Sequence, residues 1–438
     1  MMDLRNQLID ILKTEVKPAV GCTEPVAVAL ACAKAKELLD EEIVKNEILV
    51  SPSIYKNAMC VGIPGTDRLG LKIAVAMGFV GGKSEDGLTL LEGLTQEQVK
   101  ESEKYVDTTP ISITPVNSAE KVYIEVRLKG KNNTSKVIIT TKHDNFVYLQ
   151  KNDEILLNKI NEEKVEEKQI STPVVKENIM DTITIKDLVE NVEAMEFEDI
   201  KFLLDGIEMN MNMAKYGLEN KIGIGVGRGI KESIESGLLG DGIMTEAMLL
   251  TAAASDARMG GAKLPVMSSN GSGNHGLTAI LPIVAYSLKN PQSDERLAKA
   301  LAISHLVTGY IKNYTGRLSA VCGCGVAAST GASAGVAWLM DGDMKHIYGS
   351  IENMIADLSG MICDGAKAGC ALKLSSAASS AIKSAFIAKH GYAVPPLNGI
   401  VGTQVEQSIK NLGQVSDKGM KVTDEIILNV MNDMNKVD

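Results

Sequence analysis

Three cysteines in the C-terminal third constrain the fold of this chain most, because they lie in segments made almost entirely of glycine, alanine and serine. Cys322 belongs to Ala320-Val-Cys-Gly-Cys-Gly325, and Cys363 and Cys370 begin and end Cys363-Asp-Gly-Ala-Lys-Ala-Gly-Cys370. Small residues let backbones come close together and leave space for a group that is not a side chain. Three thiolates around such a space can bind three irons of a cubane iron–sulfur cluster, and the fourth iron then stays open to a substrate.

Other interpretations of these cysteines stay open from spacing alone. Cys324 competes with Cys322 as the first ligand. A closed zinc site would use both of them with Cys363 and Cys370, although Cys-x-Cys followed by Cys-x6-Cys is not a common zinc spacing. The third interpretation is a set of unrelated buried cysteines.

Composition argues against several classes of function. The 438 residues suffice for two or three domains, or for one large core with an insertion. A net charge of −10 argues against a nucleic-acid partner, and aromatic residues at 4% offer no stacking platform for bases. No apolar run precedes Val20, so we expect no signal peptide, and the uncharged stretch 318–340 is too rich in small residues to favour a membrane span. We expect a cytoplasmic protein, in which disulfides are rare and clustered cysteines favour metal binding or catalysis.

The periodicity of the sequence changes along the chain. Helical patterns cover 2–14 and 26–39, and β-branched alternation predicts strands at 47–52, 111–115, 122–128 and 136–141, with a turn at 130–133. Residues 151–178 are dense in charge and predict a solvated linker or a surface helix. From Thr184 the pattern is helical, with Gly/Ala-rich helices at 243–257, 276–288, 294–310, 320–340, 348–361 and 376–389.

These patterns predict an α+β fold, in which a Gly/Ala-rich all-helical catalytic domain carries an inserted smaller α/β domain with a short antiparallel sheet. Residues 1–45 are expected to form N-terminal helices that pack with the catalytic domain. Residues 46–178 would form the inserted domain, and residues 179–438 the helical iron–sulfur catalytic domain.

Cys22, in Gly21-Cys-Thr-Glu-Pro25, is a candidate catalytic thiol. Thr23 is a favourable N-cap and Pro25 suits the first turn, so Cys22 is predicted to lie at the start of a helix. The partial positive charge of a helix N-terminus lowers the pKa of a thiol, which can then act as a base or nucleophile near neutral pH. The alternative is a small buried hydrophobic residue.

Two polar segments are candidates for substrate binding. Ser268-Ser-Asn-Gly-Ser-Gly-Asn-His-Gly276 offers backbone N–H groups and short donors to a carboxylate, and His275 adds a donor or proton relay. Asn57 and Lys56 follow a predicted strand and could bind a carboxylate or an amino group. The remaining residues of interest are predicted to be structural: Cys32, Cys60, His143, His305, His346 and His390, with His143, at the end of a strand, the first to question.

Five motifs along the chain resemble those of one family. They are Gly21-Cys-Thr-Glu-Pro25, Ser272-Gly-Asn-His-Gly276, Gly316-Arg-Leu-Ser319, Cys322-Gly-Cys324 and Cys363-Asp-Gly-Ala-Lys-Ala-Gly-Cys370. As an ordered set they resemble the L-cysteine desulfidase family, which belongs with the iron–sulfur L-serine dehydratases, over essentially the whole chain. The resemblance implies an oxygen-sensitive enzyme with a 4Fe–4S cluster that converts L-cysteine to pyruvate, ammonia and sulfide.

The resemblance also assigns roles to residues. Cys322, Cys363 and Cys370 would bind the cluster, and Cys22 would accept the Cα proton. Cys324 gives nearly the same spacing as Cys322, which we favour because it leaves the following helix intact from Gly325. The substrate-binding residues would be Ser272, Asn274 and His275, together with Asn57. Cysteine and serine differ only in the leaving atom, so the preferred substrate stays open.

The partners follow from this assignment, and two rival functions compete with it. We expect a small amino-acid substrate, no nucleic acid, no membrane and a homo-oligomer, with a dimer favoured. A pyridoxal-phosphate dehydratase is suggested by Ser272-Gly-Asn-His-Gly276, but Lys263 lies too close to that loop and no phosphate cradle is evident. A non-catalytic iron–sulfur redox sensor would need an output surface, which the acidic balance does not offer.

Overall fold

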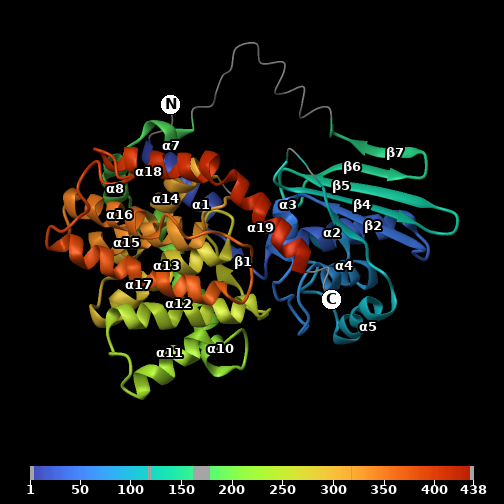
Figure 1. The fold of residues 1–438 in the computed structure, drawn as a ribbon, viewed down its shortest axis with the longest axis horizontal. Helices are drawn as coiled ribbons and strands as arrows, with labels where there is room; N and C mark the ends of the chain where they lie inside the picture. The colour runs from blue at the N-terminus through green and yellow to red at the C-terminus, as the bar shows by residue number, and fades with distance from the viewer. Residues whose placement is uncertain (1–3, 117, 119, 161–177, 317, 435–438) are drawn as a thin grey trace, which may run out of the picture.

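The computed structural model describes residues 4–116, 118, 120–160, 178–316 and 318–434. Figure 1 shows two adjoining parts, one built around a sheet and the other almost entirely helical. The strands are β1 (Pro18–Ala19), β2 (Lys45–Val50), β3 (Ile113–Pro115), β4 (Tyr123–Lys129), β5 (Thr134–Thr140), β6 (Phe146–Lys151), β7 (Glu154–Asn158) and β8 (Val266–Met267). The fold class is therefore α+β, as predicted.

The helices of the N-terminal half lie mostly beside the sheet, and those that follow build the helical part. The first group is α1 (Leu4–Glu15), α2 (Thr23–Leu39), α3 (Pro52–Ala58), α4 (Leu71–Val80) and α5 (Gln96–Thr108). The second group is α7 (Ile179–Thr182), α8 (Ile185–Glu193), α9 (Phe197–Ile200), α10 (Asp205–Glu219), α11 (Val226–Glu235), α12 (Ile243–Met259), α13 (Gly273–Lys289), α14 (Asp294–Thr315), α15 (Ser329–Leu339), α16 (Met344–Leu358), α17 (Cys370–Lys389), α18 (Val405–Gln414) and α19 (Lys421–Met434). Short 3-10 or π turns are η1 (Ser84–Thr89), η2 (Lys201–Leu204), η3 (Gly323–Ala328) and η4 (Val415–Gly419).

The six-stranded sheet has the order β3-β2-β4-β5-β6-β7. Its core follows the alternation of β4, where Ile124, Val126 and Leu128 are buried beneath α2, which packs against β4 and β5. The opposite face of β4 carries Glu125, which forms ion pairs with Arg127 and Lys136. Helices thus cover one face of the sheet, and charged side chains lie on the other.

The sheet differs from the prediction in two respects. β2 and β3 run parallel, so the sheet is mixed rather than antiparallel. β6 and β7 form a further hairpin, so residues 154–158 are a strand and not the linker or surface helix predicted for 151–178. The apolar run of β7, Ile155-Leu-Leu157, is short and is flanked by charged residues in the sequence, so it does not stand out as a strand. The rest of that predicted linker, 161–177, lies outside the described residues.

Helices in the other part pack at very short range because glycines lie at their crossings. α12 lies between α10, α11, α13 and α17, and α14 packs along α15. A Cβ placed at Gly217 would lie 2.0 Å from the carbonyl oxygen of Ala253, and one at Gly331 would lie 2.2 Å from that of Ser304. The predicted Gly/Ala-rich helices are all present, although the one expected at 320–340 begins with the π turn η3 and the one expected at 376–389 already begins at Cys370.

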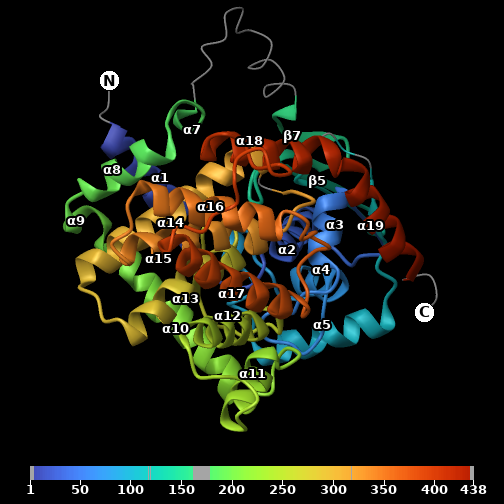
Figure 2. The same ribbon diagram turned by 60° about the vertical axis from the view of Figure 1, so that its left-hand side comes forward.

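Two chain crossings join the parts. β1 pairs antiparallel with β8, which brings the segment before α2 to the turn before α13. α19 returns from the helical part to lie beside α3 (Figures 1 and 2).

Within residues 1–45, α1 packs on α8 and α14 whereas α2 packs on the sheet. The domain boundaries at 45/46 and 178/179 stay a prediction. Among the described residues, no helix is both long and apolar enough to cross a membrane.

The helix crossings generate a stability prediction. We expect Gly331→Ala to lower the free energy of unfolding by about 1–3 kcal/mol, because the added methyl group meets the backbone of α14. Gly229→Ala, in α11 with nothing within 4 Å of the added Cβ, should instead raise it by about 1 kcal/mol. Urea unfolding followed by circular dichroism measures both. Equal effects of the two substitutions would contradict the tight crossing of α14 and α15.

Candidate active site

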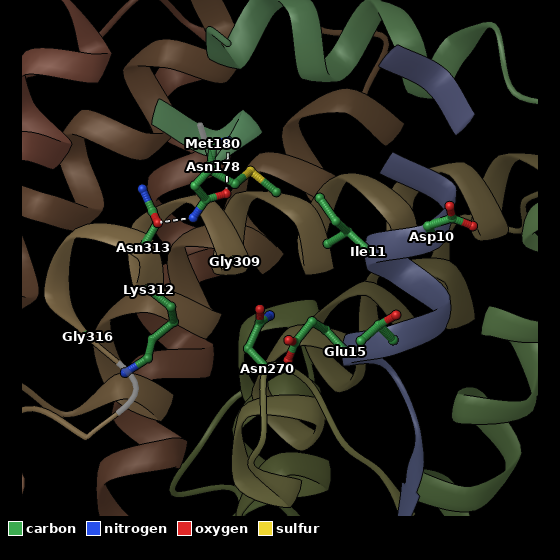
Figure 3. Close-up of a pocket in the computed structure, with 11 residues that line it drawn as sticks. Asp10, Ile11, Glu15, Asn178, Met180, Asn270, Gly309, Lys312, Asn313 and Gly316 are labelled. Carbon is green, nitrogen blue, oxygen red and sulfur yellow. Dashed lines mark hydrogen bonds between the residues drawn. The ribbon is translucent and has the colours of Figure 1, made fainter. Parts of the chain in front are cut away.

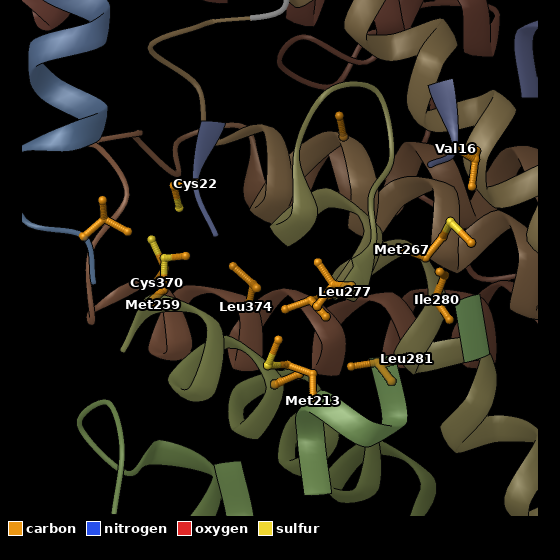
Figure 4. Packing of buried hydrophobic residues seen from close by; sticks show 14 of the residues in the cluster. Val16, Cys22, Met213, Met259, Met267, Leu277, Ile280, Leu281, Cys370 and Leu374 are labelled. Carbon is orange, nitrogen blue, oxygen red and sulfur yellow. The ribbon is translucent and has the colours of Figure 1, made fainter. Parts of the chain in front are cut away.

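A cavity of about 880 Å³ lies between the two parts and is lined by both. All eight residues predicted from the sequence line it: Cys22, Asn57, Ser272, Asn274, His275, Cys322, Cys363 and Cys370. Figure 4 shows Cys22 and Cys370 at the same end of the buried cluster, on segments far apart in the sequence. The fold therefore assembles in one place the residues that the motifs singled out separately.

Cys22 lies at the N-terminus of α2. It is itself the N-cap of the helix, where Thr23 was predicted, and it is only 3% exposed. Gly21 precedes it with φ +66°, in the left-handed region that favours glycine. Burial raises the pKa of the Cys22 thiol, while the Arg258 guanidinium acts in the opposite direction. The predicted lowering of this pKa is wrong in direction, because desolvation outweighs the opposing effect of Arg258.

Arg258 is the main residue that the sequence did not reveal. It lies in the last turn of α12, is 6% exposed and lines the cavity. Its Nη1 donates to Oδ1 of Asn274 over 2.9 Å, and its Nη2 donates to the carbonyl oxygen of Gly21 over 2.7 Å. The guanidinium thus ties the Cys22 turn to the start of α13. The available signal was an arginine in the last turn of an alanine-rich helix, where a buried cation must find partners.

The Gly/Ser/Asn segment is half turn and half helix. Asn270 and Gly271 have φ values of +48° and +81°, and α13 begins at Gly273 with Ser272 as its N-cap. Nδ1 of His275 lies 3.1 Å from the carbonyl oxygen of Ser269, which can only accept a hydrogen bond. Nδ1 is therefore protonated and donates to that oxygen. His275 lines the cavity, where its role as a donor or a proton relay stays a prediction.

The cluster cysteines lie on two segments joined by backbone hydrogen bonds. The N–H of Cys322 donates to Met361 over 2.8 Å, and the N–H of Cys363 donates to Ala320 over 2.6 Å. Cys370 opens α17, and its thiol donates to the carbonyl oxygen of Gly365 over 3.6 Å. The main chain therefore holds these thiols on neighbouring segments before any group binds between them.

Cys322 and Cys324 both line the cavity, but the pKa values of their thiols are shifted in opposite directions. The Sγ of Cys322 accepts a hydrogen bond from the N–H of Gly325 over 3.3 Å. A hydrogen bond from Cys324, together with that N–H, lowers the pKa of the Cys322 thiol. The same contact raises the pKa of Cys324. Because metals bind thiolates, the arrangement favours Cys322 over Cys324 as a ligand.

Three lysines surround the cysteines. Nζ of Lys56 donates to the carbonyl oxygen of Cys363 over 3.0 Å and pairs with Asp424 of α19 over 2.6 Å. Nζ of Lys373 donates to the carbonyl oxygen of Ile362 over 2.9 Å. Lys312 is buried beside them, and burial lowers its pKa to about 8 although the thiols oppose the shift. These cations can offset the negative charge of several thiolates in one place.

The donor set consists of cysteines, and cysteine thiolates are the usual ligands of iron–sulfur clusters. In the ranges that the structure describes, no three His, Cys, Asp or Glu side chains converge to hold one metal ion. Three cysteines with a fourth beside them, lined by lysines along an open cavity, suit an iron–sulfur cluster with an accessible corner.

Residues of the sheet part form the opposite rim. The β5–β6 turn brings Thr141, Lys142, His143 and Asp144 to the cavity, and Nε2 of His143 is buried there. His143, predicted to be structural, thus lines the site.

His305, by contrast, lies outside the lining, and burial lowers its pKa to about 3, which keeps it neutral. A second cavity of about 490 Å³ adjoins the first, and Asn270 and Lys312 line both (Figure 3).

Comparison with known proteins identifies the family of this chain. The chain is 73% identical to a UPF0597 protein of Clostridioides difficile (strain 630) over 98% of its own length and 100% of the relative's. It is 52% identical to a UPF0597 protein of Alkaliphilus oremlandii over 100% of both chains. It is 44% identical to one of Caldanaerobacter subterraneus over 97% of each. The profile of the serine dehydratase alpha chain matches residues 85–429. The chain therefore belongs to the serine dehydratase alpha-chain family, a family of iron–sulfur dehydratase-like lyases.

Proposed function

We propose that this chain is a 4Fe–4S lyase that β-eliminates sulfide from L-cysteine, giving pyruvate and ammonia. The observation that carries the proposal is the single cavity lined by Cys22 and by Cys322, Cys363 and Cys370. A β-elimination needs a base for the Cα proton and stabilisation of the leaving group, and an iron–sulfur cluster held by the three cysteines would supply the second. L-serine, which would lose water in the same way, is the second substrate of the same site.

The substrate is held by the ends of two helices. The Ser272 hydroxyl and the Asn274 amide N–H bind the α-carboxylate at the start of α13, where the helix dipole favours an anion. Asn57 already donates through Nδ2 to Glu24 over 3.1 Å, which leaves its Oδ1 to accept from the substrate ammonium group. These contacts would direct the Cα–H bond toward Cys22.

The reaction then needs one proton transfer by the chain. The Cys22 thiolate takes the Cα proton, the Cα–H electron pair forms the Cα–Cβ double bond, and the Cβ–S bond breaks to release hydrosulfide. The cluster, when bound, supplies an open iron that stabilises the departing sulfur as an anion. The resulting aminoacrylate tautomerises to an imine, and water hydrolyses it to pyruvate and ammonia.

The decisive experiment is a pyruvate assay on L-cysteine and L-serine with protein purified without oxygen and characterised for iron and sulfide content. We expect pyruvate from L-cysteine with one sulfide released per pyruvate. Pyruvate from L-serine alone would assign a dehydratase and reject the desulfidase. Absence of pyruvate from both substrates with a full cluster would reject the lyase.

The base assignment predicts a separation of turnover from metal content. Cys22→Ser should keep the cluster and lower turnover at least about 100-fold, because a hydroxyl is a far weaker base than a thiolate. Cys60→Ser, at an exposed cysteine outside the cavity, is the control and should change neither quantity. Full turnover by Cys22→Ser would show that another group removes the proton.

The ligand assignment predicts which substitutions lose iron. Cys322→Ala, Cys363→Ala and Cys370→Ala should each lose most of the bound iron, and Cys324→Ala should retain it, because Cys322 is the thiol whose anion is favoured. Iron counting and the visible absorption spectrum measure the outcome. If Cys324→Ala loses the iron and Cys322→Ala keeps it, the first ligand is Cys324.

The buried thiol predicts the pH dependence of the reaction. Burial raises the pKa of Cys22, so the fraction of thiolate in the free enzyme grows as the pH rises through and above neutrality. We expect kcat/KM for L-cysteine to rise from pH 7 to pH 9. A profile that falls over this range would place the essential base elsewhere.

A further inference from the structure

Arg258 is a buried cation without an acidic partner. Its Nη1 and Nη2 donate to neutral acceptors, the side-chain oxygen of Asn274 and the carbonyl oxygen of Gly21. Within the described part of the chain, no Asp or Glu forms an ion pair with it. Asp256, one of the nearest carboxylates in sequence, instead accepts hydrogen bonds from the backbone at the start of α11. A buried guanidinium of this kind is costly unless an anion approaches it.

One donor of the guanidinium is also unused. Nε of Arg258 is buried, and no atom of the described residues accepts a hydrogen bond from it. Buried donors are nearly always satisfied in folded proteins, so an exception needs an explanation. An uncompensated charge and an unused donor on the same side chain both indicate a site built for an anion.

The neighbouring group that can become an anion is the Cys22 thiol. Arg258 holds the carbonyl oxygen of Gly21, the residue directly before Cys22, and its charge and hydrogen bonding act on the thiol itself. The charged groups that act on Cys22 are Arg258 from α12 and Glu24 from α2, and they act in opposite directions. Glu24 is itself engaged with Asn57.

We propose that Arg258 is a positioning residue that serves as the counter-ion of the Cys22 thiolate and fixes the sulfur toward the substrate. The inference rests on the proposed role of Cys22 as base. Arginine stays protonated throughout, so it takes no proton itself. The Cα proton goes to the sulfur and discharges the ion pair, and the pair forms again when that proton leaves to water.

The packing of α13 disfavours the other obvious anion, the substrate carboxylate. A Cβ placed at Gly273 would lie 2.4 Å from Nε of Arg258 and 2.7 Å from its Cζ. The backbone at the start of α13 therefore lies against the edge of the guanidinium that contains Nε. Glycine leaves open beside Nε the position that a Cβ would occupy, which suits a single sulfur atom better than the two oxygens of a carboxylate.

The test measures the reactivity of Cys22 directly. Protein purified without oxygen is treated with iodoacetamide from pH 6 to pH 10, and the alkylation of Cys22 is followed by peptide mass spectrometry. We expect Arg258→Gln to move the midpoint for Cys22 upward by about one pH unit, which makes alkylation about ten-fold slower at a fixed pH below it. Arg258→Lys, which keeps the charge and loses the planar donors, should shift it less.

Controls separate this effect from general loss of structure. The exposed Cys60 in the same samples should keep its profile in every variant. Arg228→Gln removes an arginine on α11 that lies outside the cavity and should leave Cys22 unchanged. Gly273→Ala keeps Arg258 but displaces its guanidinium, so it should reproduce the shift even if the Arg258 variants do not fold.

The outcomes distinguish the proposals. An unchanged Cys22 profile in Arg258→Gln and in Gly273→Ala overturns the ion pair, and a raised KM with that unchanged profile would assign Arg258 to the substrate carboxylate. A shifted profile supports the ion pair. If the profile shifts but Cys22→Ser keeps full turnover, the ion pair stands and the proposed role of Cys22 as base is rejected.

Discussion

The hydrogen bonds of Arg258 are the contacts on which the rest of the site depends. One arginine from the middle of the chain holds the turn before α2 and the start of α13 at the same time. The same two segments are also joined by the pairing of β1 with β8 and by hydrogen bonds from Ser268 to Lys17 and from Asn270 to Glu15, but Arg258 is the residue that contacts the turn at Cys22 itself. A planar group with five donors suits this task, because it can bind two fixed acceptors and still present a donor to a third group.

Burial and charge oppose each other throughout the cavity. Desolvation raises the pKa of Cys22 and lowers that of Lys312, so both groups are shifted toward their neutral forms. The opposite charges lie on neighbouring elements, a guanidinium beside Cys22 and ammonium groups beside the cluster cysteines. A buried thiolate or a buried cation alone would be unfavourable, and the fold stabilises both by bringing thiols and cations to the same buried surface.

Local motifs were enough to find the residues of the site but not their electrostatics. Cys22, the Ser272–His275 turn and the three cluster cysteines were each recognisable within a few residues, and all line the cavity. Arg258 was not, because one of its partners is 237 residues away in sequence. The pKa of Cys22 was predicted in the wrong direction because burial is a property of the whole fold, whereas a helix start is visible locally.

The fold shows the same division between local and distant information. The Gly/Ala-rich helices were predictable from composition and period, and so was the α+β class. The parallel pairing of β2 with β3 was not, since it joins Ile48 to Ile113 across three helices. β7 was missed because its five residues are flanked by charged neighbours that resemble a solvated surface.

The backbone hydrogen bonds between the Cys322 and Cys363 segments have a practical consequence for handling the protein. Because the main chain itself joins these segments, their sulfurs are already gathered without help from a bound metal. Air-damaged material should therefore regain its inorganic centre from ferrous salts and sulfide under a reducing atmosphere, with no cycle of denaturation and renaturation.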